Sequence, residues 1–247
     1  MRPMLKVNTM NLKCSKSVLL GTSALVCLAL SAPVMADDFV ITGSDNSING
    51  TGTTNGGTAA AIAADAINGS DTVSLGINLT TTGTNQGIIT TGGGNTVTVT
   101  GTGSITTGTG NYADGISILG GNNTTTISGS IKTAGYSAGG IYNDGSNNTA
   151  TVSGSITTTG KASYGILNWG ASNETTISGS ITTTGDDSYG IRNDGNNNTT
   201  TISGTVKVTG ASSAALYNYS GSGNSFTLNE GATIIGDILA VDNVATI

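Results

Sequence analysis

The 247-residue sequence contains no histidine, only two cysteines and only two prolines. Both cysteines, Cys14 and Cys27, lie near the N-terminus, so the rest of the chain has neither histidine nor thiol. Histidine-assisted serine catalysis, thiol catalysis and the usual zinc ligand sets are therefore excluded there. The serines lie mainly in Ser-Gly-Ser corners, where a turn role explains them. We expect no catalytic residue, no cofactor and no metal site, and hence no enzyme.

The first 36 residues are organised as a secretory signal peptide. A start with four Lys or Arg residues precedes an apolar run from Val18 to Leu30. Val34 and Ala36 then occupy the small-residue positions of a cleavage site before Asp37. The apolar run is shorter than the ~20 residues of a membrane-spanning helix. We therefore predict that residues 1–36 are removed during export through the inner membrane.

Removal of this leader changes the charge and the redox chemistry of the chain. Residues 37–247 keep four basic residues against fourteen acidic ones, a formal charge of −10. Nucleic acid and anionic membranes are therefore not expected as partners. Without cysteine, the exported chain has no disulfide, although its compartment permits them. Packing and backbone hydrogen bonds must hold the fold together.

A sequence that begins at Asn123 recurs three times at intervals of 25 residues. The four copies begin NTTTISGSIKTAG, NTATVSGSITTTG, NETTISGSITTTG and NTTTISGTVKVTG. Three apolar columns stay in register through the copies: Ile127, Val152, Ile177 and Ile202; Ile131, Ile156, Ile181 and Val206; and Ile141, Ile166, Ile191 and Leu216. A flexible linker has no reason to keep its large apolar residues in register. The copies are therefore predicted to pack on one another.

Each copy consists of about three short strands. Thr-rich segments alternate about an isoleucine and are separated by Ser-Gly, Thr-Gly and Asp-Gly pairs, a strand pattern. Asp-Gly is also a hairpin signal, which leaves an antiparallel meander or sandwich as an alternative. A constant 25-residue interval is required only by a parallel β-solenoid, in which equivalent strands stack at ~4.8 Å. We predict an all-β, parallel β-helix of about eight coils.

Glycine and polar columns accompany the apolar ones. Two glycine columns are expected at corners where a Cβ would be opposed: Gly129, Gly154, Gly179 and Gly204; and Gly135, Gly160, Gly185 and Gly210. A column of asparagines either forms a hydrogen-bonded amide ladder or simply favours turns: Asn143, Asn168, Asn193 and Asn218. Tyr164 and Tyr189 share one column and are expected to stack.

The repeats divide the chain into three parts. After the signal peptide, residues 37–94 are predicted to form divergent coils or an N-terminal cap, and residues 95–247 the regular solenoid. The run TAAAIAADAI from Thr58 is the only helix-compatible segment. The apolar end, FTLNEGATIIGDILAVDNVATI, carries no polar cap. We therefore expect a truncated solenoid whose last edge contacts a following segment, a partner or a second copy.

A signal peptide followed by coils of the form NTTTISGSITTTG and ending in GATIIGDI resembles the passenger region of bacterial type V autotransporters. The resemblance covers residues 37–247 and implies a right-handed β-helix displayed on the outer membrane or released. It implies an adhesive or spacing stalk that acts without catalysis, and a C-terminal β-barrel translocator encoded downstream. The departure from that family is the absence of the barrel strands and of an aromatic last residue.

Four aromatic residues are candidates for a ligand-contact surface: Tyr142, Trp169, Tyr217 and Tyr219. Exposed aromatic rings provide a large contact area at low entropic cost, so a host-surface or matrix protein or a glycan is the expected partner. An alternative function is a β-helical polysaccharide-acting enzyme that uses surface carboxylates. Asp186 and Asp187 are its candidates, and together with Asp144 and Asp194 they are candidates for a calcium site. The corner of Asp186 and Asp187 holds Lys161 and Ala162 one repeat earlier, which favours a solvated polar corner.

Overall fold

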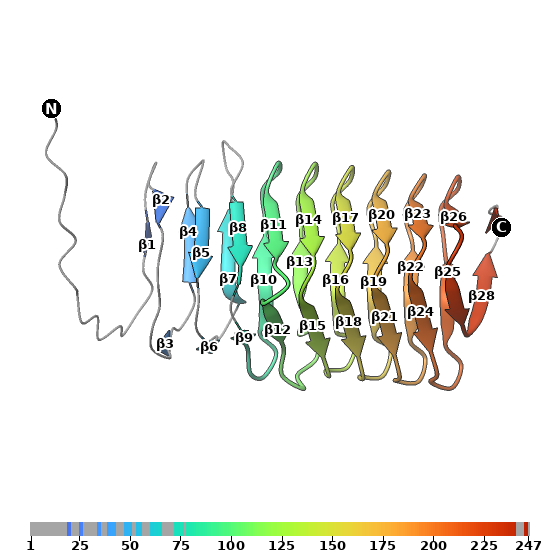
Figure 1. Ribbon diagram of the computed structural model, residues 1–247, viewed down its shortest axis with the longest axis horizontal. Coiled ribbons are helices and arrows are strands. Elements are labelled where there is room, and N and C mark those ends of the chain that lie inside the picture. The colour runs from blue at the N-terminus through green and yellow to red at the C-terminus, as the bar shows by residue number, and fades with distance from the viewer. Residues whose placement is uncertain are drawn as a thin grey trace, which may run out of the picture.

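The structure is a computed structural model that describes residues 72–76 and 78–240, together with seven short strands before them and one after. In these residues every regular element is a strand, and the strands build three parallel sheets (Figure 1). The fold is therefore a β-solenoid, as predicted. The predicted signal peptide lies outside the described residues except for the backbone of three two-residue strands, so export stays a prediction.

Each coil contributes one strand to each sheet. Sheet A contains β1 (Leu19–Leu20), β4 (Phe39–Thr42), β7 (Ala60–Asp65), β10 (Gln86–Thr90), β13 (Ile116–Ile118), β16 (Gly139–Asn143), β19 (Tyr164–Asn168), β22 (Tyr189–Asn193), β25 (Ala214–Asn218) and β28 (Asp237–Ala240). Sheet B contains β2 (Leu25–Val26), β5 (Ser47–Gly50), β8 (Thr72–Leu75), β11 (Thr96–Val99), β14 (Thr124–Ile127), β17 (Thr149–Val152), β20 (Glu174–Ile177), β23 (Thr199–Ile202), β26 (Ser225–Leu228) and β29 (Ala245–Thr246). Sheet C contains β3 (Val34–Met35), β6 (Thr53–Asn55), β9 (Asn78–Thr80), β12 (Ser104–Thr106), β15 (Ser130–Thr133), β18 (Ser155–Thr158), β21 (Ser180–Thr183), β24 (Thr205–Val208) and β27 (Thr233–Ile235).

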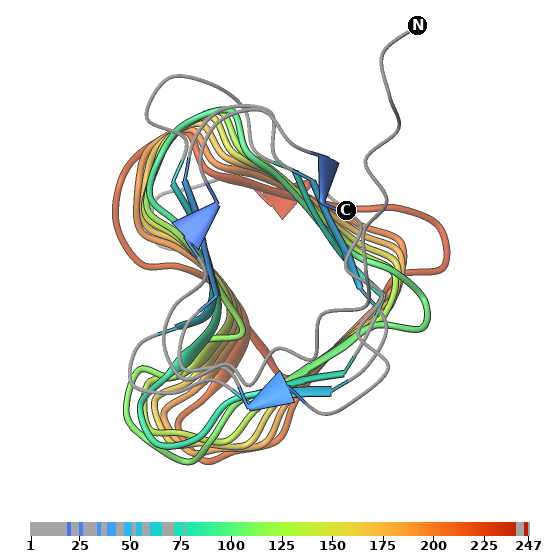
Figure 2. The same ribbon diagram turned by 90° about the vertical axis from the view of Figure 1, so that its left-hand side faces the viewer.

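Seven coils lie between β8 and β28, which is close to the eight predicted for the exported chain. Viewed along the axis, successive coils superpose on one outline (Figure 2). The coil of residues 72–90 already stacks in the same three sheets as the regular repeats that follow. The helix-compatible alanine run forms strand β7, which pairs with β4 and β10.

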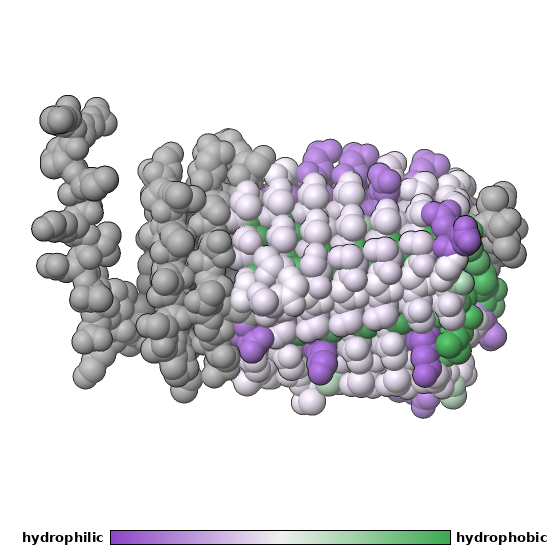
Figure 3. All heavy atoms as spheres, viewed as in Figure 1, coloured by the Kyte–Doolittle hydropathy of each residue, from purple (hydrophilic) through white to green (hydrophobic). Residues whose placement is uncertain are grey.

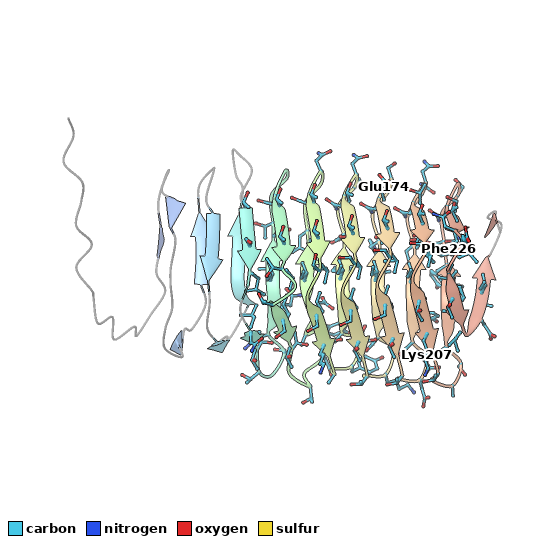
Figure 4. The ribbon with its side chains drawn as sticks, in the orientation of Figure 1. Glu174, Lys207 and Phe226 are labelled. Atoms are coloured by element: carbon cyan, nitrogen blue, oxygen red, sulfur yellow. The ribbon has the colours of Figure 1, made fainter. Side chains whose placement is uncertain are left out.

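The interior is made of the predicted apolar columns. Ile127, Val152, Ile177 and Ile202 pair in register through sheet B, and the other two columns do the same in sheets C and A. All twelve predicted core residues are fully buried. Each buried isoleucine removes its side chain from water and contributes about 1.5–3 kcal/mol by the hydrophobic effect. Phe226 fills the interior of the last regular coil, and Figure 4 shows it between Glu174 and Lys207 at the rod's margins.

Two polar columns share this interior. Asn143, Asn168, Asn193 and Asn218 form the amide ladder, in which each side-chain nitrogen donates to the next oxygen at 2.8–3.0 Å. A second column starts the copies, and there each Asn oxygen accepts the backbone N–H one coil earlier, for example Asn123 N–H to Asn148 Oδ1 at 2.8 Å. Buried amides are costly unless paired, so these bonds fix the register of the coils. In the second column the side-chain nitrogens of Asn148, Asn173 and Asn198 have no hydrogen-bond partner among the described residues.

The corners differ from the prediction in their physical cause. The predicted glycines have no positive φ. A side chain is excluded there because an added Cβ would meet a carbonyl of the preceding coil, for example at 1.8 Å from the oxygen of Gly160 if Gly185 were replaced. The non-glycine residues with positive φ among the described residues have values between 51° and 59° and lie in two other columns, with Ser137 and Asn147 as examples. Asparagine tolerates this left-handed region better than most residues.

Candidate functional site

The outer surfaces of the three sheets have different chemistry. From β8 to β26, the outward positions of sheet B carry Thr or Ser, apart from Glu174. From β12 to β24, sheet C carries Ser or Thr outside, apart from Lys132 and Lys207. The chain has ten aromatic residues, and six of them lie on the exterior of sheet A. That selective placement makes sheet A's exterior the candidate site.

We call this exterior the aromatic face. Its members are Leu119, Tyr142, Asp144, Tyr164, Leu167, Trp169, Tyr189, Arg192, Asp194, Tyr217 and Tyr219. The parallel register of β16, β19, β22 and β25 brings the first row into line, with Tyr142 beside Leu167, then Arg192 and Tyr217. The second row follows the ends of these strands, where backbone hydrogen bonds of 2.8–2.9 Å continue the ladder at Asp144, Trp169 and Tyr219.

The structure therefore brings the four predicted contact residues onto one face. Tyr217 and Tyr219 touch edge to face with ring centroids 5.5 Å apart. Trp169 and Tyr219 are 52% and 53% exposed, whereas Tyr142 and Tyr217 are only partly exposed. The expected stack of Tyr164 on Tyr189 is present, with centroids 6.2 Å apart.

An ion pair fixes the centre of the aromatic face. Arg192 donates from Nε and from one terminal nitrogen to the two oxygens of Asp194, at 2.6 and 2.7 Å. The guanidinium carbon lies 4.1 Å from the centroid of the Tyr219 ring and 5.4 Å from that of Tyr189. Burial acts to lower the pKa of Arg192, but its bond to Asp194 and the nearby charges outweigh this, and the pKa is raised. The arginine stays charged and orients the surrounding rings.

Tyr142 is a permanent hydrogen-bond donor on this face. Burial, followed by the charges of Asp144 and Asp114, raises the pKa of its phenol to about 12. Its hydroxyl is therefore protonated at every physiological pH. A partner with acceptor oxygens can use it without proton transfer.

Sequence reasoning did not place Arg192 on the contact surface, and it named Asp194 only as a candidate calcium ligand. A usable signal was present, because residues two apart in a strand point to the same side, which places this pair together on the exterior. Leu119 was missed and Asp144 was named only as a candidate calcium ligand, although each stands 25 residues before a member of the same row.

Asp114 is buried two residues before strand β13 of sheet A. Its carboxylate accepts the backbone N–H of Gly139 at 2.6 Å and the hydroxyl of Ser117 at 3.0 Å, with Gln86 at 3.4 Å. Burial raises the pKa of this carboxyl from 3.8 to about 6, although those hydrogen bonds oppose the change. No repeat signal points to Asp114, because the same position holds Gly139 and Tyr164 in later coils.

We expect Asp114→Asn to remove one source of pH-dependent stability. With a raised pKa, the folded state favours the neutral acid, whose stabilising effect is complete below pH 3.8 and is lost as pH rises through about 6. The loss corresponds to roughly 3 kcal/mol. Thermal melting of both proteins between pH 4 and 7.5 should show equal stability at low pH and a more stable variant at high pH. A difference independent of pH would contradict the assignment.

The carboxylates of Asp186 and Asp187, the candidates for a catalytic or calcium site, interact with other groups of the protein. Asp186 Oδ1 accepts the backbone N–H of Ala211 at 2.8 Å, and Asp187 pairs with Lys161 at 3.0 Å on the exposed surface. Within the part of the chain that the structure describes, no three His, Cys, Asp or Glu residues lie close enough to hold a metal ion. The same residues include no helix long and apolar enough to cross a membrane.

Serine positions follow the corners of the coil. A shallow groove runs along Ser128–Ser130, Ser153–Ser155 and Ser180, lined only by serine and glycine. Residues 135–139 read Gly-Tyr-Ser-Ala-Gly, the spacing of a nucleophile elbow, with Ser137 at φ 51°. Ala162, one coil later, has nearly the same φ at the same corner. The strained conformation therefore belongs to the coil and not to a catalytic serine.

Compared with family models, with curated proteins and with solved structures, the chain shows no match. The class of protein is defined by the fold itself, a β-solenoid with one aromatic face.

Proposed function

We propose that this chain is an exported, rod-shaped passenger of the bacterial autotransporter type, displayed at the cell surface or released, that binds a partner without catalysis. The observation that carries the proposal is the segregation of six aromatic residues onto one face of a rod whose other two faces are mainly Thr and Ser. Large rings held rigidly by stacked strands make a binding surface at low entropic cost. The resemblance of the repeats to autotransporter passengers supplies the display route.

Other parts of the proposal concern the ends of the rod. A β-barrel translocator encoded downstream would hold the passenger at the outer membrane, as the family resemblance implies. Figure 3 shows hydrophobic residues gathered at the C-terminal end of the described coils, where Ile235, Ile238 and Leu239 are more than 40% exposed. Contact of this end with a following segment or with a second copy belongs to the same proposal.

Export is tested by expressing all 247 residues in a Gram-negative host and measuring the mass of the protein outside the cytoplasm. We expect a chain that begins at Asp37, because cleavage after Ala36 satisfies the small-residue rule. Replacement of Ala36 by Arg should block processing and serve as the control. An unprocessed protein that stays in the cytoplasm would refute the export step.

Catalysis is tested on the same exported protein. Incubation with polysaccharides should leave their chain length unchanged by size-exclusion chromatography, because we expect binding and no bond cleavage. Release of oligosaccharides, lost on joint replacement of Asp186 and Asp187 by Ala, would instead establish the alternative, a polysaccharide-acting enzyme.

A further inference from the structure

The second row of the aromatic face alternates from coil to coil. Leu119, Trp169 and Tyr219 occupy every second coil and are 41%, 52% and 53% exposed, and the coils between them carry Asp144 and Asp194. Backbone hydrogen bonds of 2.8–2.9 Å keep Asp144, Trp169, Asp194 and Tyr219 in register. We call Leu119, Trp169 and Tyr219 the platforms of the aromatic face. Because coils stack at ~4.8 Å, these platforms recur at about 9.6 Å along the rod.

This interval has a chemical counterpart in extended glycans. In a β-1,4-linked pyranose chain, successive rings are turned over, so every second ring presents the same face, at a repeat close to two strand spacings. The C–H groups on the faces of such rings are apolar and pack on aromatic or aliphatic side chains. The edges carry hydroxyls that hydrogen-bond carboxylates and phenols.

The residues between the platforms suit the hydroxyl edges. Asp144 is exposed between Leu119 and Trp169 and offers carboxylate acceptors. Between Trp169 and the last platform, the Arg192–Asp194 pair is mostly covered, with side-chain exposures of 14% and 5%. Its guanidinium lies against the Tyr219 ring, so the pair positions that platform before any ligand arrives. Preorganisation of this kind improves affinity by avoiding the cost of ordering on binding.

Charge narrows the class of glycan. Arg192 of the first row neutralises Asp194 of the second row, and Asp144 remains as one net negative charge. The exported chain as a whole carries a formal charge of −10. A polyanionic glycan, with carboxylates or sulfates along its length, would be repelled.

We propose that the aromatic face binds an uncharged β-1,4-linked glycan that lies parallel to the rod axis, with Leu119, Trp169 and Tyr219 under alternate sugar rings. This inference rests on the proposed binding function and names its partner. The first row, which includes Tyr142 and Tyr217, lines one side of the bound chain. Tyr142 donates its phenolic hydrogen to a sugar oxygen.

Trp169 is the only tryptophan in the chain, so intrinsic fluorescence of the exported protein reports directly on the central platform. Chitohexaose and cellohexaose are both uncharged and β-1,4-linked, and we expect either to change the Trp169 emission. A ratio far from one between their affinities would show whether acetamido groups contribute. Chitobiose reaches one platform only and should bind at least about tenfold more weakly.

Variants test the platform geometry by isothermal titration calorimetry with the better hexasaccharide. Trp169→Ala should lower the affinity by about tenfold or more. Tyr136→Ala is the matched control, because Tyr136 is 47% exposed and its ring contacts that of Tyr112, outside the aromatic face. The double variant Asp144→Trp with Trp169→Asp keeps composition and charge but destroys the two-coil interval, so it should bind as poorly as Trp169→Ala.

Three results would overturn the proposal: no response to either hexasaccharide at millimolar concentration, equal losses in the Trp169 and Tyr136 variants, or equally tight binding of the polyanion hyaluronan. Different results would contradict the proposed function itself. If the hexasaccharides do not bind but the exported chain binds a protein and loses that binding on Trp169→Ala, the binding function stands and the glycan inference falls. If the hexasaccharides are cleaved, the non-catalytic function falls.

Discussion

Ile181→Asp should cost the protein about 3–5 kcal/mol or more in free energy of unfolding. Ile181 has no exposed surface and stacks between Ile156 and Val206 in sheet C. In the coils that the structure describes, the interior is lined by aliphatic side chains, threonines and asparagines, so a carboxylate at position 181 has no cationic partner there. Urea unfolding followed by far-ultraviolet circular dichroism measures the loss.

The chain itself supplies two controls for this experiment. Ile181→Val makes the residue match Val206 in the same column, and it should cost only about 0.5–1.5 kcal/mol. Thr182→Asp adds the same charge one residue away on the outer side of β21 and should change stability by roughly 0.5 kcal/mol or less. An equal loss at positions 181 and 182 would show that charge, and not burial, is responsible, and the inward assignment of the column would fail.

The solenoid could be predicted because one physical rule connects sequence to fold. A side chain in one coil contacts the equivalent side chain in the next coil. The interval of 25 residues therefore predicts which residues are in contact, and it correctly places Ile156 beside Ile181. The amide ladder through Asn168 was predictable on the same ground. The competing hairpin reading of Asp194-Gly195 fails because the next strand pairs in parallel with its copy.

The candidate site was only partly predictable, since its contacts join different columns. Tyr217 packs on Tyr189 at 4.9 Å, although these residues occupy different positions of the repeat. The stacking of Arg192 on Tyr219 likewise depends on how side chains lean across rows. The role of Asp114 could not be predicted from the repeat, because no other copy has a carboxyl at the equivalent position. The residues that repeat at 25-residue intervals determine the fold, whereas the candidate site is made by residues that differ from one coil to the next.

The alanine run of β7 shows a different limit. Local composition is helix-compatible, but residues 60–65 form a strand because both neighbouring strands of sheet A offer a ladder of backbone partners. Context of this kind routinely overrides intrinsic propensity. The 25-residue repeat weakens in this part of the chain, so the sequence carried no second signal to correct the first.

Gly185→Ala should be among the most damaging single-methyl changes at a corner. An added Cβ would lie 1.8 Å from the carbonyl oxygen of Gly160 and 2.4 Å from its carbon. That carbonyl cannot simply turn away, because it also accepts the hydroxyl of Ser188 at 3.2 Å. The two coils must separate, and overpacking of this kind costs about 1–3 kcal/mol or more.

Gly101→Ala is the matched control, and its expected effect has the opposite sign. A Cβ at Gly101 meets no atom within 4 Å, and its φ is not in the left-handed region. An alanine there restricts the unfolded chain without strain and should stabilise the protein by roughly 0.4–1 kcal/mol. Thermal melting compares the two variants. Limited trypsin digestion adds a local test, because Lys161 follows the displaced carbonyl and should be cut faster only in Gly185→Ala. If both substitutions had the same small effect, close contact between the backbones of successive coils would not be what selects glycine at this corner.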